Sequence, residues 1–208
     1  MSRRPSRQAP YDRKDPHYRR ARAAGYRARS AYKLIELDDR FRLLRPGDVV
    51  VDLGAWPGAW MQVAAERVGP SGRVIGLDLE TLEPVGSERV TSLTGDVRDP
   101  AVIAELRRRL GGPGSVLLSD LAPKLTGIRD TDEARGSELV GAAIDALPHL
   151  LRAGGRLMLK LFMNSDLPAT MDALRRLFEQ VKTTRPEATR RGSSELYVIA
   201  FGYQGPCG

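Results

Sequence analysis

The sequence predicts an α/β domain with a mostly parallel sheet and helices on both faces. Short apolar runs typical of buried strands alternate along the chain with stretches of helical periodicity, which is the pattern of strand–helix–strand units. The 208 residues are enough to bury one full core, and 41% hydrophobic with 28% charged residues is ordinary for a globular domain. The sequence shows no internal repeat and no sign of a second domain.

The expected elements follow one another from residue 30 onward. Ser30 is expected to cap a first helix that runs to Arg42, because a serine hydroxyl can accept from the free N–H groups of a first helical turn. Asp130, with Glu133 three residues later, has the spacing of a capping box and is expected to introduce the longest helix. Strands are expected over 49–55, 73–79, 90–94, 115–121, 155–162 and 195–203, with a short further stretch near 181–186. The other helices are expected over 58–68, 99–110, 133–151 and 166–180.

Positive charge is concentrated near the beginning of the chain. Residues 1–45 carry 14 Lys and Arg against 5 Asp and Glu, whereas the rest of the chain carries 19 against 21. Tyrosines alternate with the basic residues there, and this combination suits the backbone and the exposed bases of a nucleic acid. Residues 1–24 are therefore predicted to be a flexible nucleic-acid-binding arm, with 1–20 disordered when free, ahead of a single domain over 25–208. The alternative is a solvated tail.

The sequence also excludes several classes of protein. No apolar run approaches the roughly 18 residues of a membrane helix, and the Arg-rich beginning has no apolar stretch behind it, so neither a membrane span nor a secretory signal is expected. Cys207 is the single cysteine, which forbids an internal disulfide and fits a reducing cytoplasm. His17 and His149 have no Cys or acidic residues at ligand spacing, so no metal is expected. We expect a monomer.

A glycine-containing loop, "DLGAWPGAW", follows the first strand. In an open parallel sheet, ligands bind beyond the carboxyl ends of the strands, and this loop lies at that end. Gly54 and Gly58 allow the backbone to approach a ligand closely. The loop lacks the G-x-G-x-x-G spacing that binds a pyrophosphate, and Asp52 beside it favours a cation over a phosphate.

Acidic residues follow the next two strands. Asp78 ends the second strand, where it can accept hydrogen bonds from ribose hydroxyls, and Asp96 follows the third, within reach of an adenine amine. A sugar, a base and a cationic group without phosphate together describe S-adenosylmethionine. The alternative interpretation is that these acids are ordinary turn residues, since Asp is common after strands.

Four charged residues are oddly placed for a purely structural role. Asp120 ends the fourth strand, Lys160 lies inside a strand that is apolar on both faces, and Glu195 begins the last strand. If that last strand runs antiparallel to the rest, all three meet at the edge where the cofactor is expected. Lys33 lies in the first turn of a helix, where the helix dipole disfavours a cation. The alternative is a set of structural salt bridges.

The chain resembles the FtsJ/RrmJ-type ribosomal RNA large-subunit methyltransferases over roughly residues 26–203. The resemblance is carried, in order, by "RSAYKL", "DLGAWPGAW", "GLDL", "GDVRD", "SDLAP", "LMLKLF" and "SSELY". It implies a Rossmann-like seven-stranded methyltransferase sheet with an antiparallel last strand. It also implies methylation of a uridine 2′-hydroxyl in 23S rRNA of the large (50S) subunit, with S-adenosylmethionine as cofactor.

The resemblance assigns residues as well. The family's K-D-K-E catalytic tetrad matches Lys33, Asp120, Lys160 and Glu195. Its cofactor-binding positions match Gly58, Trp60, Asp78, Asp96 and Asp120. The chain departs from the usual D-L-G-x-A-P-G-G-W at Trp56 and Ala59, for which we expect altered cofactor affinity without loss of function.

The implied mechanism makes Lys160 the proton acceptor for the ribose hydroxyl. Burial and the nearby cation Lys33 favour its neutral amine, whereas Asp120 and Glu195 oppose this and orient the reacting groups. Trp60 either packs on the cofactor or fills the core. Three other functions stay open from the residues: a nicotinamide-dependent oxidoreductase, a non-catalytic RNA-binding assembly factor, and a 2′-O-methyltransferase of tRNA.

Overall fold

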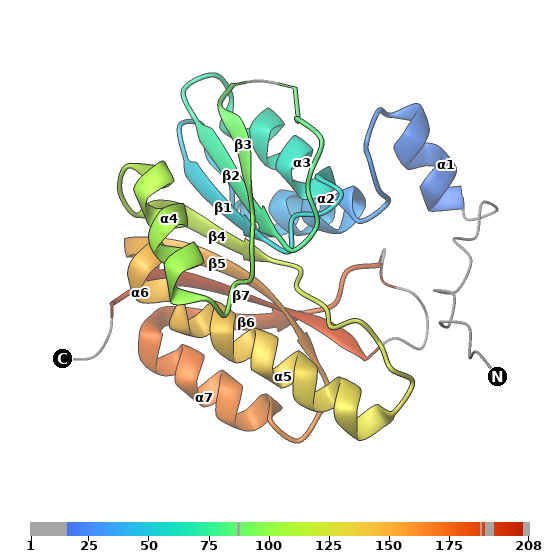
Figure 1. The fold of residues 1–208 in the computed structure, drawn as a ribbon, viewed down its shortest axis with the longest axis vertical. Coiled ribbons are helices and arrows are strands. Elements are labelled where there is room, and N and C mark those ends of the chain that lie inside the picture. The colour runs from blue at the N-terminus through green and yellow to red at the C-terminus, as the bar shows by residue number, and fades with distance from the viewer. Residues whose placement is uncertain (1–15, 87, 188, 190–193, 206–208) are drawn as a thin grey trace.

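The computed structural model describes residues 16–86, 88–187, 189 and 194–205, and in these ranges the strands form one seven-stranded sheet. The strands lie in the order β3-β2-β1-β4-β5-β7-β6 (Figure 1). Their bounds are β1 Val49–Leu53, β2 Arg73–Asp78, β3 Val90–Thr94, β4 Gly114–Ser119, β5 Leu151–Phe162, β6 Phe178–Thr184 and β7 Glu195–Tyr203. Neighbouring pairs from β3 to β5 are parallel, and β7 is antiparallel to both β5 and β6. The predicted fold class and antiparallel last strand are confirmed.

Helices cover both faces of this sheet, as predicted. Their bounds are α1 Pro16–Ala23, α2 Ala31–Phe41, α3 Ala59–Val68, α4 Pro100–Leu110, α5 Arg129–Asp145, α6 Leu147–Leu150 and α7 Leu167–Leu177. One core cluster packs α2 and α3 on one face, and a second packs α4 to α7 on the other (Figure 1). Because strand side chains alternate between faces, Val50 belongs to the first cluster and Val51 to the second.

The beginning of the described chain corrects two predictions. Residues 16–20 were expected to be disordered, but they lie in α1, which buries Ala21 completely and places the Arg20 guanidinium 4.8 Å from the centre of the Tyr32 ring. Residues 1–15 lie outside the described ranges, so the rest of that prediction and the division at residue 24 stay predictions. Ser30 precedes α2 as expected, but its side chain makes no capping hydrogen bond. It already has helical backbone angles (φ −59°, ψ −20°), whereas a capping residue is usually extended.

The longest helix also differs from its prediction. It begins at Arg129 and ends at Asp145, and a separate turn, α6, follows it up to β5. Glu133 forms an ion pair with Arg129 one turn earlier, so the expected capping box with Asp130 is absent. Pro148 lacks a backbone N–H, which interrupts the helical ladder where one continuous helix to residue 151 was expected.

Two further boundaries differ from their predictions. Helix α7 ends at Leu177 instead of residue 180, since buried Phe178 is already extended and begins β6. This strand occupies the place of the short stretch expected near residues 181–186. Strand β5 begins at Leu151, four residues before its prediction.

A buried ion pair joins the segment before β1 to strand β5. Arg156 of β5 donates to Asp48 Oδ1 at 2.6 Å and to the carbonyl of Leu43, and both members of the ion pair are buried. The guanidinium thereby ties the connection before β1 to β5, two strands away in the sheet. Within the described residues, no helix is long and apolar enough to cross a membrane.

Candidate active site

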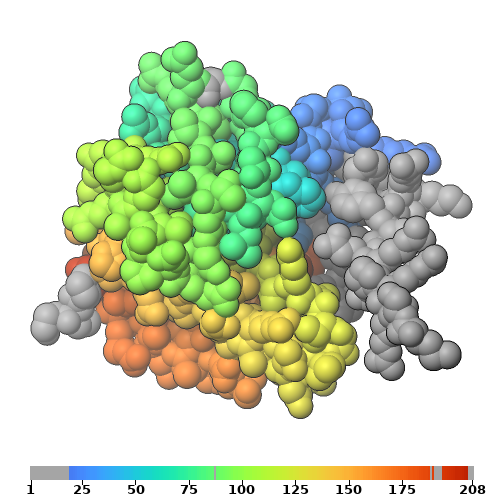
Figure 2. Space-filling model, in the orientation of Figure 1, coloured from blue at the N-terminus to red at the C-terminus, as the bar shows by residue number. Residues whose placement is uncertain are grey.

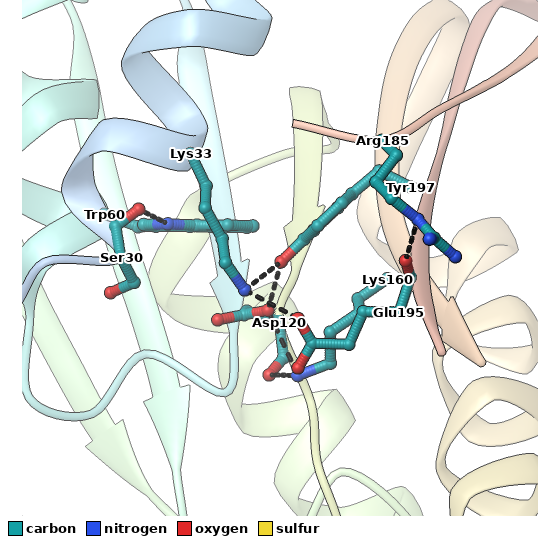
Figure 3. Close-up of polar contacts among 8 residues, drawn as sticks. All are labelled: Ser30, Lys33, Trp60, Asp120, Lys160, Arg185, Glu195 and Tyr197. Atoms are coloured by element: carbon teal, nitrogen blue, oxygen red, sulfur yellow. Dashed lines mark hydrogen bonds and ion pairs between the residues drawn. The ribbon is translucent and has the colours of Figure 1, made fainter. Parts of the chain in front are cut away.

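The four residues of the predicted charged cluster meet at the carboxyl edge of the sheet (Figure 3). Lys33 Nζ donates to Glu195 Oε2 at 2.8 Å. Lys160 Nζ donates to the backbone carbonyl of Asp120 at 2.8 Å, and it lies 3.1 Å from Asp120 Oδ1. The structure therefore brings the four together as two adjacent lysine–carboxylate pairs.

The direction of the last strand produces this convergence. Asp120 follows the end of β4, and Lys160 lies near the end of the parallel strand β5. Since β7 runs the opposite way, its first residue, Glu195, pairs with Phe162 at the end of β5. Lys33 reaches the same edge from the first turn of α2. The helix dipole disfavours a cation there, and the carboxylate of Glu195 compensates for it.

Tyr197 is the site residue that the sequence reasoning missed. Its hydroxyl donates to Asp120 Oδ1 at 2.9 Å and accepts from Lys33 Nζ at 3.2 Å, so it joins the two pairs (Figure 3). Burial, followed by the charges of Asp120 and Glu195, raises the pKa of the phenol far above its usual value, and the group remains a donor. The available signal was its position two residues after Glu195, on the same side of the strand.

A cavity of about 250 Å³ adjoins the cluster. Its walls come from the ends of β1 to β4 and from α5, and are formed by Gly54, Trp56, Leu77, Asp78, Leu79, Gly95, Asp96, Val97, Asp120, Leu121, Ala122 and Leu139. Gly54 has φ +81°, and a Cβ there would lie 3.0 Å from the backbone nitrogen of Leu121, so glycine is required. Among the described residues, three carboxylates and no Lys or Arg line this cavity, which favours a cationic nucleoside over a phosphate-bearing one.

Two of these carboxylates already accept hydrogen bonds. Asp78 accepts from the backbone N–H groups of Trp56 at 2.8 Å and Glu80 at 3.0 Å, so it fixes the loop after β1. Asp96 binds the Arg98 guanidinium, with 2.6 Å between Oδ2 and Nη2, and this hydrogen bond is the main reason that its pKa lies below the usual value. Each carboxylate has further lone pairs for a ligand in the cavity.

Gly58 and Trp60 lie outside the cavity walls, so their predicted contact with the cofactor stays a prediction. Gly58 has φ +102°, and a Cβ there would lie 3.0 Å from Arg27 Nη1. Trp60 is buried, donates from its indole to the Ser30 carbonyl at 2.8 Å, and packs against Tyr197 with 6.1 Å between the ring centres. Ala59 is buried, whereas Trp56 is exposed at the rim.

Asp52 is completely buried in β1 beneath the loop, and neither carboxylate oxygen has a hydrogen-bond partner in the described part of the chain. Burial, followed by the charges of Asp120 and Asp78, raises its pKa well above the usual value. An unsatisfied carboxyl below an acidic cavity makes this a site that a positively charged ligand would stabilise. The cavity, its acidic walls and this buried acid fit S-adenosylmethionine.

The strand order, the cavity at the carboxyl ends of the parallel strands and the adjacent lysine–carboxylate cluster define a methyltransferase of the α/β class. The family is also clear. The chain belongs to the FtsJ-like methyltransferases, whose family model matches residues 26–203. The predicted resemblance is confirmed.

Relatives and solved structures agree with this assignment. The ribosomal RNA large subunit methyltransferase E of Syntrophobacter fumaroxidans is 45% identical over 92% of this chain and 96% of its own, and that of Azoarcus is 45% identical over 89% and 90%. The crystal structure of a ribosomal RNA methyltransferase from Plasmodium falciparum superposes with a TM-score of 0.77 at 27% identity, covering 86% of this chain and 100% of that one. Aeropyrum pernix fibrillarin, solved with S-adenosylmethionine, shares the fold alone (TM-score 0.57, 16% identity, 82% and 76% covered).

Proposed function

We propose that the protein methylates a ribose 2′-hydroxyl of ribosomal RNA, specifically a uridine in the 23S RNA of the large subunit, with S-adenosylmethionine as donor. One observation carries the chemistry: Asp120 lines the cofactor cavity and also binds the ammonium group of Lys160. A base candidate therefore adjoins the place where the methyl donor fits. A non-catalytic RNA-binding factor has no use for a buried lysine at this edge.

Lys160 is the proposed proton acceptor. A ribose hydroxyl is a weak nucleophile, so its proton must leave as the oxygen attacks. Lys160 Nζ, in its neutral form, takes that proton, and the carbonyl and carboxylate of Asp120 hold the resulting ammonium at 2.8 and 3.1 Å. The Lys160 side chain is almost fully buried, which excludes bulk water from competing for the same nitrogen.

Lys33, Glu195 and Tyr197 position the reacting groups. The Lys33–Glu195 pair is partly buried and faces the same edge as Lys160, where it can bind the ribose and orient its hydroxyl. Tyr197, whose phenol keeps its proton, holds Asp120 Oδ1 in place through the 2.9 Å hydrogen bond. Much of the rate enhancement would come from this positioning.

Asp78 and Asp96 are the proposed holders of the cofactor. Asp78 would accept from ribose hydroxyls and Asp96 from the adenine amine, while the acidic surroundings of Asp52 and Asp120 favour the cationic part of the molecule. When bound, the cofactor supplies an electrophilic methyl group. Gly58 and Trp60 belong to the proposal through the family resemblance.

The proposed RNA substrate and cellular location rest on the charge distribution of the chain and on the names of its relatives. The +9 balance of residues 1–45 suits an RNA backbone, and the curated relatives are named for the RNA of the large ribosomal subunit. We propose that the protein acts in the cytoplasm as a monomer, on the 50S particle or its precursor, with residues 1–24 as an RNA-binding arm.

Methyl transfer from labelled S-adenosylmethionine tests the function directly. The acceptors are 50S particles, naked 23S rRNA and tRNA from cells that lack this gene, each assayed with wild type and with Lys160→Ala. We expect label on large-subunit RNA with wild type alone, at a uridine 2′-oxygen when the RNA is mapped. Label on tRNA alone would mean that tRNA is the substrate instead of ribosomal RNA. Binding of RNA without any methyl transfer would favour a non-catalytic RNA-binding factor.

A further inference from the structure

A second cavity, of about 590 Å³, adjoins the cofactor cavity and shares one wall residue with it, Trp56. It opens between the segment that joins α1 to α2, the loop after β1 and the connection from β2 to β3. The lining residues are Arg22, Gly25, Tyr26, Arg27, Trp56, Pro57, Thr81, Leu82 and Glu83. Figure 2 shows the N-terminal helix, in blue, beside the green segment after β2. We call this cavity the Trp56 cleft.

Trp56 is unusually placed for an indole. Its side chain is 59% exposed, and no hydrogen bond or ring contact of the indole is found among the described residues. Its backbone is nevertheless fixed, because its N–H donates to Asp78 and the adjoining Pro57 restricts the chain. A large apolar ring on a fixed backbone, open to solvent between two cavities, is poised to contact a ligand.

The other walls of the cleft are preformed. The Arg27 guanidinium donates to the carbonyl of Pro57 at 3.1 Å and to that of Glu83 at 2.7 Å, which ties the loop after β1 to the β2–β3 connection. The Tyr26 hydroxyl donates to Glu66 at 2.7 Å. Burial, followed by that hydrogen bond, raises the pKa of Tyr26 to about 12, so the phenol stays neutral at any working pH.

Basic residues outnumber acidic ones in the lining of the cleft. Arg22 and Arg27 line it together with one acid, Glu83, and Arg19 and Arg20 belong to the same helix as Arg22. An aromatic platform flanked by guanidinium groups is the arrangement by which proteins hold single-stranded nucleic acids, since every base has a face that can stack and every phosphate is negative. Cavities of this size hold ligands as large as a nucleotide.

We propose that the Trp56 cleft binds one unstacked base of the substrate RNA close to the target nucleotide, with Trp56 as its stacking platform. The proposal rests on the proposed function in one respect, that the ligand is RNA. Because Trp56 also forms a wall of the cofactor cavity, a nucleotide in the cleft lies next to the one whose ribose reaches Lys160. Occupancy of the cleft thus sets the register of the RNA on the enzyme.

Tryptophan fluorescence tests the contact without any catalytic step. The chain has two tryptophans, and only Trp56 is open to a collisional quencher, since Trp60 is buried. We expect a single-stranded oligouridylate to shield wild type from acrylamide, and inorganic polyphosphate, which has charge but no bases, to give no shielding. The shielding should vanish in Trp56→Phe. Equal shielding by polyphosphate would overturn the proposal.

Affinity variants give a second, independent measure. Trp56→Ala should weaken oligouridylate binding by roughly 5- to 150-fold, the range for losing one base-stacking residue, whereas Trp56→Phe should keep most of the affinity. Leu125→Ala is the matched control, because Leu125 is 77% exposed yet lines neither cavity. An unchanged affinity of Trp56→Ala for oligouridylate, or an equal loss of affinity in Leu125→Ala, would contradict the proposal.

The two proposals fail separately. If RNA shields Trp56 of the wild-type protein but no methyl group is transferred to any RNA, the proposal for the Trp56 cleft is supported and the proposed reaction is wrong. If the wild-type protein methylates large-subunit RNA and Trp56→Ala does so with an unchanged KM for RNA, the proposed reaction is supported and the proposal for the Trp56 cleft is wrong.

Discussion

Tyr197 and Lys160 meet on one oxygen atom: the phenol donates to Asp120 Oδ1 at 2.9 Å, and the ammonium nitrogen lies 3.1 Å from that same atom. These residues face each other in the register of β5 and β7. The proposed base is therefore oriented through a carboxylate that a neighbouring strand holds in place.

The first prediction concerns this relationship. Tyr197→Phe should lower kcat for methyl transfer by roughly ten- to hundredfold, because a hydrogen bond to a charged acceptor contributes about 1.5–3 kcal/mol, and should leave the affinity for S-adenosylmethionine unchanged. Tyr203→Phe is the control: this buried hydroxyl on the same strand has no partner in the described structure, so its loss should be neutral or slightly stabilising. Equal loss of activity in both variants would indicate a general packing effect.

The second prediction concerns the proton acceptor. Lys160→Ala should reduce methyl transfer by a factor of about a hundred or more, the usual contribution of a general base, with cofactor affinity near that of wild type. Glu195→Ala should be milder, since Glu195 only orients Lys33. Steady-state assays with labelled cofactor measure both. More than about a tenth of wild-type turnover in Lys160→Ala would exclude the role assigned to this amine.

The third prediction concerns the cofactor cavity. Asp78→Ala should weaken S-adenosylmethionine binding by about 1–3 kcal/mol in calorimetry, because a charged acceptor is lost and the Trp56 N–H that it holds is released. Asp78→Asn keeps the shape and should lose less. The fold should survive in both, because the side chain lies at a strand end. Unchanged affinity in the alanine variant would remove Asp78 from the site.

The fourth prediction follows from the raised pKa of Asp52. An acid whose pKa is higher in the folded state binds its proton more tightly when folded. The free energy of unfolding therefore falls as the pH rises from about 4, where Asp titrates in an unfolded chain, through the higher folded-state pKa. Asp52→Asn removes this titration.

Denaturant titrations between pH 5 and 8 should accordingly show a shallower loss of stability in Asp52→Asn than in wild type. The slopes are compared, because the unpartnered amide of Asn has the same cost at every pH. Parallel curves for the two proteins would mean that Asp52 is not titrating in that range.

The fifth prediction concerns the basic N-terminal segment. Deleting residues 1–15 removes Arg3, Arg4, Arg7, Arg13 and Lys14 but keeps α1 and Lys33. RNA affinity should fall, and each lost phosphate contact should flatten the slope of log affinity against log salt by roughly 0.7–0.9. Melting and cofactor binding should not change. A salt series that gives the same slope with and without the segment would make it a solubility tail.

Much of the fold was predictable because its signals are local. Apolar runs and glycine turns predict the described strands to within a few residues. The charged residues Asp120, Lys160 and Glu195 of the strands, with Lys33 at a helix start, indicate the cluster. The antiparallel direction of β7 is implied by the family resemblance, and it is the direction that brings Glu195 to the edge of the cluster.

What the sequence did not predict depends on contacts between distant segments. Phe178 ends α7 early because its ring packs in the core, 5.2 Å from that of Tyr203, and no local pattern announces this. The signal for Tyr197, its spacing from Glu195, is weak because tyrosine is an ordinary strand residue. The capping box is absent because α5 begins at Arg129, which places Asp130 inside the first helical turn instead of at the capping position.

Lys33 and Glu195 are 162 positions apart along the chain, yet they form one ion pair. Among the described strands β7 is synthesised last, and its place in the sheet is between β5 and β6, which are made before it. Between the synthesis of β6 and that of β7, the edges of β5 and β6 that β7 covers are therefore unpaired, and the catalytic cluster lacks Glu195 and Tyr197. The cluster is complete only when β7 is in place, so we expect a chain that stops before residue 195 to lack activity and to expose two strand edges that favour aggregation.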